Sequence, residues 1–62
     1  MKRYTVCLSR DRAFCEQATK EVAERNNAVD YEIILVETRR GYQMAYRGEI
    51  ILEEEIKNGI KL

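Results

Sequence analysis

The sequence predicts a single small α/β domain, residues 1–62, folded as a two-layer α+β sandwich in which a small mixed sheet carries helices on one face. The spacing of the apolar residues supports this prediction. They alternate near the start of the chain, recur at helical spacing in the next segment, and stand side by side in the segment after it. We expect the elements in the order β-α-β-β-β-α.

The first expected element is a strand over residues 3–9, because one of its two faces is apolar. That face carries Tyr4, Val6 and Leu8. Cys7 falls on the opposite face, where nothing in the sequence activates a thiol. The segment RAFCEQATKEVAERNN follows two good N-cap residue types, Ser9 and Asp11, and predicts a helix that ends near the Asn26-Asn27 pair.

The run YEIILVET is typical of a strand covered on both faces, because apolar residues occupy adjacent positions in it. We expect this run to be the central strand. The segments YQMAY and EIIL flank a tight turn at RG, so residues 42–52 predict a hairpin. The last segment, EEEIKNGIKL, predicts a closing helix with a narrow apolar stripe of Leu52, Ile56 and Ile60.

The composition excludes several classes of protein. Eleven basic and eleven acidic side chains give zero net charge, which argues against sequence-independent nucleic-acid binding. The chain lacks an apolar run of the ~20 residues that a membrane span requires, and we expect a cytoplasmic protein without membrane contact. Two cysteines and no histidine predict neither a metal site nor a disulfide framework, and we expect no cofactor.

The run YTVCLSRDRAFCEQATKEVAE resembles the opening strand and first helix of the glutaredoxin and thioredoxin families, in which a C-x-x-C motif starts the helix. Here RAFC occupies that place, so Arg12 stands at the nucleophilic cysteine and Cys15 at the second cysteine. The later YQMAYRGEIILEEEIKNGI is similar to the final hairpin and closing helix of these families. The resemblance implies a thioredoxin-like fold and a glutaredoxin-like thiol protein in which Cys15 acts alone and Arg12 holds the carboxylate of a glutathione-like substrate.

The chain departs from this family pattern at three points. An arginine at position 12 cannot form the mixed disulfide that starts thiol exchange. A chain without proline cannot supply the cis-proline that faces the active site in these families. The short link ETRRG leaves no room for their middle helix, which favours a hairpin between the second and third strands.

Cys15 has two interpretations. A helix N-terminus with Arg10 and Arg12 nearby lowers the pKa of a thiol and makes it reactive. Alternatively, Cys15 packs in the core with the helical stripe that contains Phe14 and Val22. We favour the core, and in that interpretation the chain has no catalytic residue.

Arginines follow two strands that we expect to run parallel. Arg10 and Arg12 come after the first strand, and Arg39 and Arg40 come after the second. Parallel strands end at the same edge of a sheet, so these guanidinium groups would meet beside a helix N-terminus, as a site for a phosphate or a carboxylate. The simpler alternative is that all four are solvated surface residues.

Tyr42, Met44 and Tyr46 alternate beside Arg47, which is typical of an interaction surface or a stacking platform for single-stranded nucleic acid. The same alternation would also serve a strand that packs beneath a helix. Because two short helices cover only one face of the sheet, the open face needs polar residues or a partner.

These observations favour a small non-catalytic α/β interaction or regulatory module. Neither a P-loop nor a G-x-S-x-G motif is present, which leaves hydrolase and kinase chemistry without support. We expect the module to bind a protein partner, or a second copy of itself, through the open sheet face and the strand-end arginines. The alternative is the Cys15 thiol protein, and nucleic-acid binding ranks third.

Overall fold

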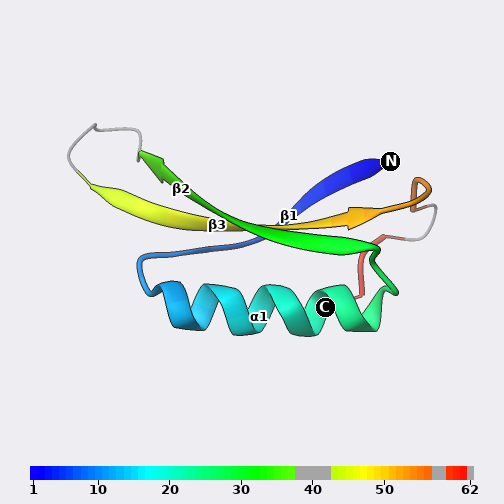
Figure 1. Ribbon diagram of the computed structural model, residues 1–62, viewed down its shortest axis with the longest axis horizontal. Helices are drawn as coiled ribbons and strands as arrows, with labels where there is room; N and C mark the ends of the chain where they lie inside the picture. The colour runs from blue at the N-terminus through cyan, green and yellow to red at the C-terminus, as the bar shows by residue number, and fades with distance from the viewer. Residues whose placement is uncertain (38–42, 57–58, 62) are drawn as a thin grey trace.

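The computed structural model describes residues 1–37, 43–56 and 59–61 and has two layers (Figure 1). The elements, in chain order, are β1 (Lys2–Ser9), α1 (Arg12–Arg25), β2 (Asp30–Glu37) and β3 (Met44–Leu52). The three strands form one antiparallel sheet, and α1 lies along one of its faces. A small α/β fold is confirmed, with an antiparallel sheet in place of the predicted mixed one.

The sheet has the strand order β1-β3-β2. Both outer strands pair antiparallel with β3, so β1 and β2 run in the same direction and finish at the same end of the sheet. That arrangement confirms the predicted parallel relation of the strands on either side of the helix. We call the end of the sheet where β1 and β2 finish and β3 begins the distal end.

The predicted start and end of α1 are confirmed. Asp11 is the N-cap, and its carboxylate accepts a hydrogen bond from the Phe14 amide at 3.2 Å. Asn26 is the C-cap, and Asn27 follows it with φ of 54°, in the left-handed region that commonly ends helices.

The predicted hairpin over residues 42–52 is wrong, because β3 runs without a turn through Arg47 and Gly48. Gly48 serves a close approach of the helix to the sheet. A Cβ atom added there would overlap the Thr19 hydroxyl and lie 2.9 Å from the Thr19 Cβ. Gly48 is therefore a contact point for α1 within the strand, where the sequence had suggested a turn.

The run YEIILVET forms a strand, β2, but the prediction that it is central is wrong. The central strand is β3, because it returns between the two parallel strands. As an edge strand, β2 is less covered than its apolar run suggested, and Leu35 is 53% exposed.

A β-bulge interrupts β1 and corrects the predicted faces of that strand. The register with β3 shifts between Thr5 and Cys7, so Val6 is the extra residue. Beyond the bulge, Cys7 pairs with Gly48, which faces α1, and Leu8 pairs with Arg47 on the other face. The two residues therefore exchange the faces that simple alternation assigned to them.

The predicted closing helix is absent from the described residues 53–56 and 59–61. Its predicted apolar stripe nevertheless reaches the core: Leu52 is buried, and Ile56 and Ile60 pack against the cluster of Val22, Ala23 and Ile50. The Tyr4 hydroxyl accepts a hydrogen bond from the Ile56 amide at 3.2 Å. The three residues of the predicted stripe therefore share one side, but the described backbone that carries Ile56 and Ile60 has no regular secondary structure.

Asn26 holds the C-terminal segment against the end of α1. Its side-chain nitrogen donates to the Lys61 carbonyl at 2.7 Å and to the Val22 carbonyl at 2.8 Å. Its side-chain oxygen accepts from the Lys61 amide at 2.9 Å. One residue thus closes the helix and fixes the segment that completes the core.

Candidate functional site

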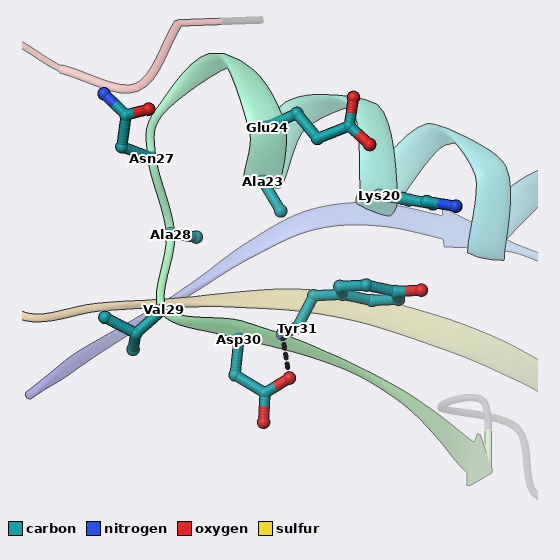
Figure 2. A pocket seen from close by; sticks show the side chains of 8 residues that line it. All are labelled: Lys20, Ala23, Glu24, Asn27, Ala28, Val29, Asp30 and Tyr31. Carbon is teal, nitrogen blue, oxygen red and sulfur yellow. Dashed lines mark hydrogen bonds between the residues drawn. The ribbon is translucent and has the colours of Figure 1, made fainter.

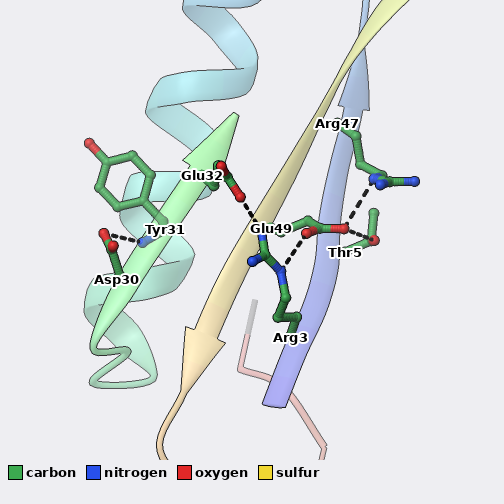
Figure 3. Close-up of polar contacts among 7 residues, drawn as sticks. All are labelled: Arg3, Thr5, Asp30, Tyr31, Glu32, Arg47 and Glu49. Atoms are coloured by element: carbon green, nitrogen blue, oxygen red, sulfur yellow. Dashed lines mark hydrogen bonds and ion pairs between the residues drawn. The ribbon is translucent and has the colours of Figure 1, made fainter. Parts of the chain in front are cut away.

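The face of the sheet turned away from α1 is the main candidate site, and we call it the open face. Gly48 faces Thr19 of α1, so its neighbours Arg47 and Glu49 face the other way by strand alternation. Glu49 stands between Thr5 of β1 and Glu32 of β2. Figure 3 shows this row of polar side chains with α1 behind the sheet.

Glu49 is the centre of a charged network on this face, although only 12% of its side chain is exposed. Its Oε1 lies 2.9 Å from Nε of Arg3, and its Oε2 lies 3.1 Å from Nε of Arg47. The Thr5 hydroxyl donates to the same carboxylate at 3.4 Å. Three neighbouring groups therefore compensate the buried negative charge.

Arg3 joins the two edge strands through this network. Its guanidinium also pairs with Glu32, which lies directly opposite Glu49 in the register (Figure 3). Hydrogen bonds to Glu32 and to Glu49 raise the pKa of Arg3 above its ordinary value. Two arginines and two glutamates thus neutralise one another, and the centre of the open face is polar but carries no net charge.

Nearer the distal end, the open face becomes apolar. Leu8 and Ile34 flank Arg47 in one row, and Val36 belongs to the next row along β2. Leu8 is 67% exposed, while Ile34 and Val36 are half-buried. An arginine between aliphatic side chains is typical of the core of a protein interface.

The structure divides the predicted site residues between different surfaces. Arg10 and Arg12 are exposed at the junction of β1 and α1, at the distal end. Arg47 lies on the open face, and Tyr46, half-buried, lies on the face toward α1. The predictions for Arg39, Arg40 and Tyr42 lie outside the described residues.

The two cysteines lie close together on the helix side of the sheet. Cys15 is fully buried, and its Sγ donates to the Tyr46 carbonyl at 3.4 Å, which confirms that it packs in the core. The stripe predicted with it is confirmed for Val22 but wrong for Phe14, which is 59% exposed. Cys7 is half-buried, and both thiols are free. Burial, and then a hydrogen bond with Cys15, raise the pKa of Cys7. The bulge in β1 creates this proximity, which strand alternation alone did not predict.

A groove that the sequence did not predict lies between the second half of α1 and the start of β2 (Figure 2). Its volume is about 470 Å³. Ala23, Ala28 and Tyr31 contribute apolar surface, and Lys20, Glu24 and Asp30 contribute charges of both signs. Asp30 accepts a hydrogen bond from the Tyr31 amide at 2.8 Å. Ala23 and Ala28 have small side chains, so space remains between α1 and the start of β2. The sequence alone did not indicate a groove there, because it marks these alanines only as residues of a helix and of a loop.

Two further findings apply to the part of the chain that the structure describes. No group of three or more histidine, cysteine, aspartate or glutamate residues there could hold a metal ion. The described helix, α1, is too short and too polar to cross a membrane.

Comparison with protein-family models, with curated proteins and with solved structures finds no match to this chain. The resemblance to glutaredoxins and thioredoxins therefore stays a prediction. The described residues define a small protein with one helix on a three-stranded antiparallel sheet and a second sheet face without a covering helix.

Proposed function

We propose that the chain is a small non-catalytic module that binds a protein partner through the open face and the arginines at its distal end. The observation that carries this proposal is the contrast between the two sheet faces. One face is covered along most of its length by α1 and the C-terminal segment, and its exposed leucine, Leu35, lies at the distal end. The other face has no covering element among the described residues and presents Leu8 at 67% exposure, and Arg10 and Arg12 follow Leu8 in the chain.

Two properties of the open face support protein binding over catalysis. Its charged residues are already paired with one another, so Glu49 and Arg3 form a structural network with little freedom to act on a substrate. Its exposed part combines an aliphatic side chain with an arginine, a composition that interface cores favour. The exposed Arg10 and Arg12 would add contacts to carboxylates of the partner.

A tagged, purified chain tests this proposal by affinity capture from the cells that encode it, followed by titration of each purified candidate partner. Leu8→Glu and the pair Arg10→Glu with Arg12→Glu should each weaken binding at least about tenfold. Leu35→Glu is the matched control, because Leu35 is a leucine of similar exposure, 53%, on the other face of the sheet. Binding that survives both test variants, or that falls equally with Leu35→Glu, would overturn the proposal.

A further inference from the structure

The close approach of α1 to the sheet brings Cys7 and Cys15 together. Cys7 pairs with Gly48 and lies on the helix side of the sheet. Gly48 has no side chain, so Thr19 lies against its backbone, and a Cβ atom added to Gly48 would stand 2.9 Å from the Thr19 Cβ. Cys15 precedes Thr19 by one turn on the same face of α1. The two cysteines therefore flank one point of close contact between the helix and the sheet.

The contacts of the two thiols place them next to each other. Sγ of Cys15 donates to the carbonyl of Tyr46, two residues before Gly48 on β3. The Cys7 thiol is in hydrogen-bond contact with the Cys15 thiol. A disulfide requires Cβ atoms about 4 Å apart, a separation that only neighbouring side chains reach. Two free thiols in mutual contact meet this first requirement for a bridge.

The two thiols differ in their access to solvent. Cys15 is fully buried, whereas Cys7 is half-buried and belongs to an edge strand. An oxidant from solution therefore reaches Cys7 first, and Cys15 reacts only with a group that is already bound to Cys7. An accessible cysteine beside a second, resolving cysteine is the usual arrangement at sites of reversible thiol oxidation.

We propose that Cys7 and Cys15 form a reversible disulfide between β1 and α1 when the chain meets a low-molecular-weight disulfide such as glutathione disulfide. The Cys7 thiolate attacks one sulfur of glutathione disulfide, the bond between its two sulfurs breaks, and one glutathione leaves as a thiolate. The Cys15 thiolate then attacks Sγ of Cys7 in the mixed disulfide and expels the second glutathione. The two protein thiols lose two electrons, and their two protons pass to the two glutathione thiolates.

The rate and the extent of this reaction depend on different properties. Only a thiolate attacks a disulfide, so the raised pKa of Cys7 makes the first step slow at neutral pH. The oxidised fraction at equilibrium depends instead on how well the bridge fits the fold. The bridge would close a loop that contains Leu8, Arg10 and Arg12, but its formation is measured without a partner and does not depend on the proposed binding function.

Equilibration of the reduced full chain in glutathione buffers of known thiol-to-disulfide ratio tests the proposal. Remaining thiols are blocked with N-ethylmaleimide at mildly acidic pH, and the chain is digested with trypsin without reduction. Because cleavage after Arg10 and Arg12 separates the cysteines, a bridge appears in mass spectra as peptide 4–10 joined to peptide 13–20. The equilibrium constant for oxidation should be at least about tenfold larger in the folded chain than in urea, because a bridge that fits the fold stabilises it by the same factor.

Two single variants are the matched controls. Cys15→Ala lacks the thiol that expels the second glutathione, so the mixed disulfide at Cys7 should accumulate. In Cys7→Ser, Cys15 should stay reduced, because it is fully buried and no neighbouring thiol carries glutathione to it. Circular dichroism checks that both variants are folded.

Thermal unfolding of the wild-type chain gives a second measurement that needs no variant. The oxidised chain should unfold at least about 5 °C above the reduced chain, and dithiothreitol should restore the lower midpoint. Equal equilibrium constants in the folded chain and in urea, glutathione that stays on wild-type Cys7, or bridges only between chains would overturn the proposal. An oxidised midpoint equal to or below the reduced one would also overturn it, because the bridge would then not fit the fold.

Discussion

Arg3 donates a hydrogen bond from Nε to Oε1 of Glu49 across 2.9 Å, so a cation on an edge strand neutralises a carboxylate in the middle of the sheet. The Arg3 side chain is 48% exposed, whereas the Glu49 side chain is 12% exposed. Water can solvate the arginine but hardly reaches the carboxylate. Glu49 therefore depends on Arg3 more than Arg3 depends on Glu49.

Arg3→Met should lower the free energy of unfolding, because it leaves Glu49 and Glu32 directly opposite each other without the cation that joins them. Urea unfolding measures the loss. Adding Glu49→Gln should recover part of it, since the buried charge is then removed. Lys2→Met, a change of an exposed cation on the same strand, is the control. Equal stability of the Arg3→Met and Lys2→Met chains would contradict the dependence of Glu49 on Arg3.

Gly48→Ala should destabilise the fold by about 1–3 kcal/mol, because the new methyl group must displace α1 at Thr19. Equilibrium unfolding checks this value. Thr19→Ala in the Gly48→Ala background should reduce the loss, because the hydroxyl that overlaps the methyl group is gone. If the two substitutions are additive, Gly48 and Thr19 do not contact each other in the way the structure shows.

Cys15 should resist iodoacetamide until the protein unfolds, because its side chain is fully buried. Cys7 should react first, with a midpoint pH above that of a free thiol, because its pKa is raised. Peptide mapping by mass spectrometry separates the two sites, and the denatured protein is the control. Fast alkylation of native Cys15 below the ordinary thiol pKa would instead favour the glutaredoxin-like alternative.

The raised pKa of Cys7 also predicts how the free energy of unfolding changes with pH. The folded state favours the neutral thiol. The stability that this preference contributes is therefore fully present below the ordinary thiol pKa, where the thiol is neutral in both the folded and the unfolded chain. As pH rises past that value, the unfolded chain loses its proton first, and stability should fall. Urea unfolding of wild type and Cys7→Ser across the alkaline range measures the effect, and parallel pH profiles of the two chains would exclude it.

Asn26→Ala should cost about 1–3 kcal/mol, because it removes hydrogen bonds to Val22 and to both backbone groups of Lys61. Hydrogen exchange at the Lys61 amide should accelerate at the same time. Asn27→Gly is the control, since φ of 54° at that position suits glycine. If exchange at Lys61 is unchanged in Asn26→Ala, Asn26 does not hold the C-terminal segment.

The sequence predicted the local elements better than their arrangement. The strand before α1, the caps of α1 and the strand after it follow from alternation, helical spacing and cap residues. The position of β3 between the other strands depends on pairing between residues far apart in the chain, such as Tyr4 with Ile50, which periodicity does not report. Gly48 was misread for the same reason, because the residue that requires it, Thr19, lies on another element.

The candidate site was predicted only in part. The need for an uncovered sheet face to be polar or partnered was a sound expectation, and Arg47 is on that face. Arg3 and Glu49 were missed as a pair, since they are far apart in the sequence and their contact depends on the order of the strands. Leu8 was assigned to the covered face, because a bulge leaves no clear mark on an alternating pattern.

The bulge at Val6 also makes the two edges of the sheet unequal as places where a further strand could pair. An incoming strand needs a regular row of backbone donors and acceptors, and β1 interrupts that row where β2 does not. Of the two edge strands, only β2 thus offers a regular row for backbone pairing, and there Asp30 and Glu37 would repel an identical strand. The bulge in edge strand β1 and the acidic residues of edge strand β2 therefore disfavour edge-to-edge association of the sheets of two chains. Contacts with another protein are then favoured on the face of the sheet over its edges.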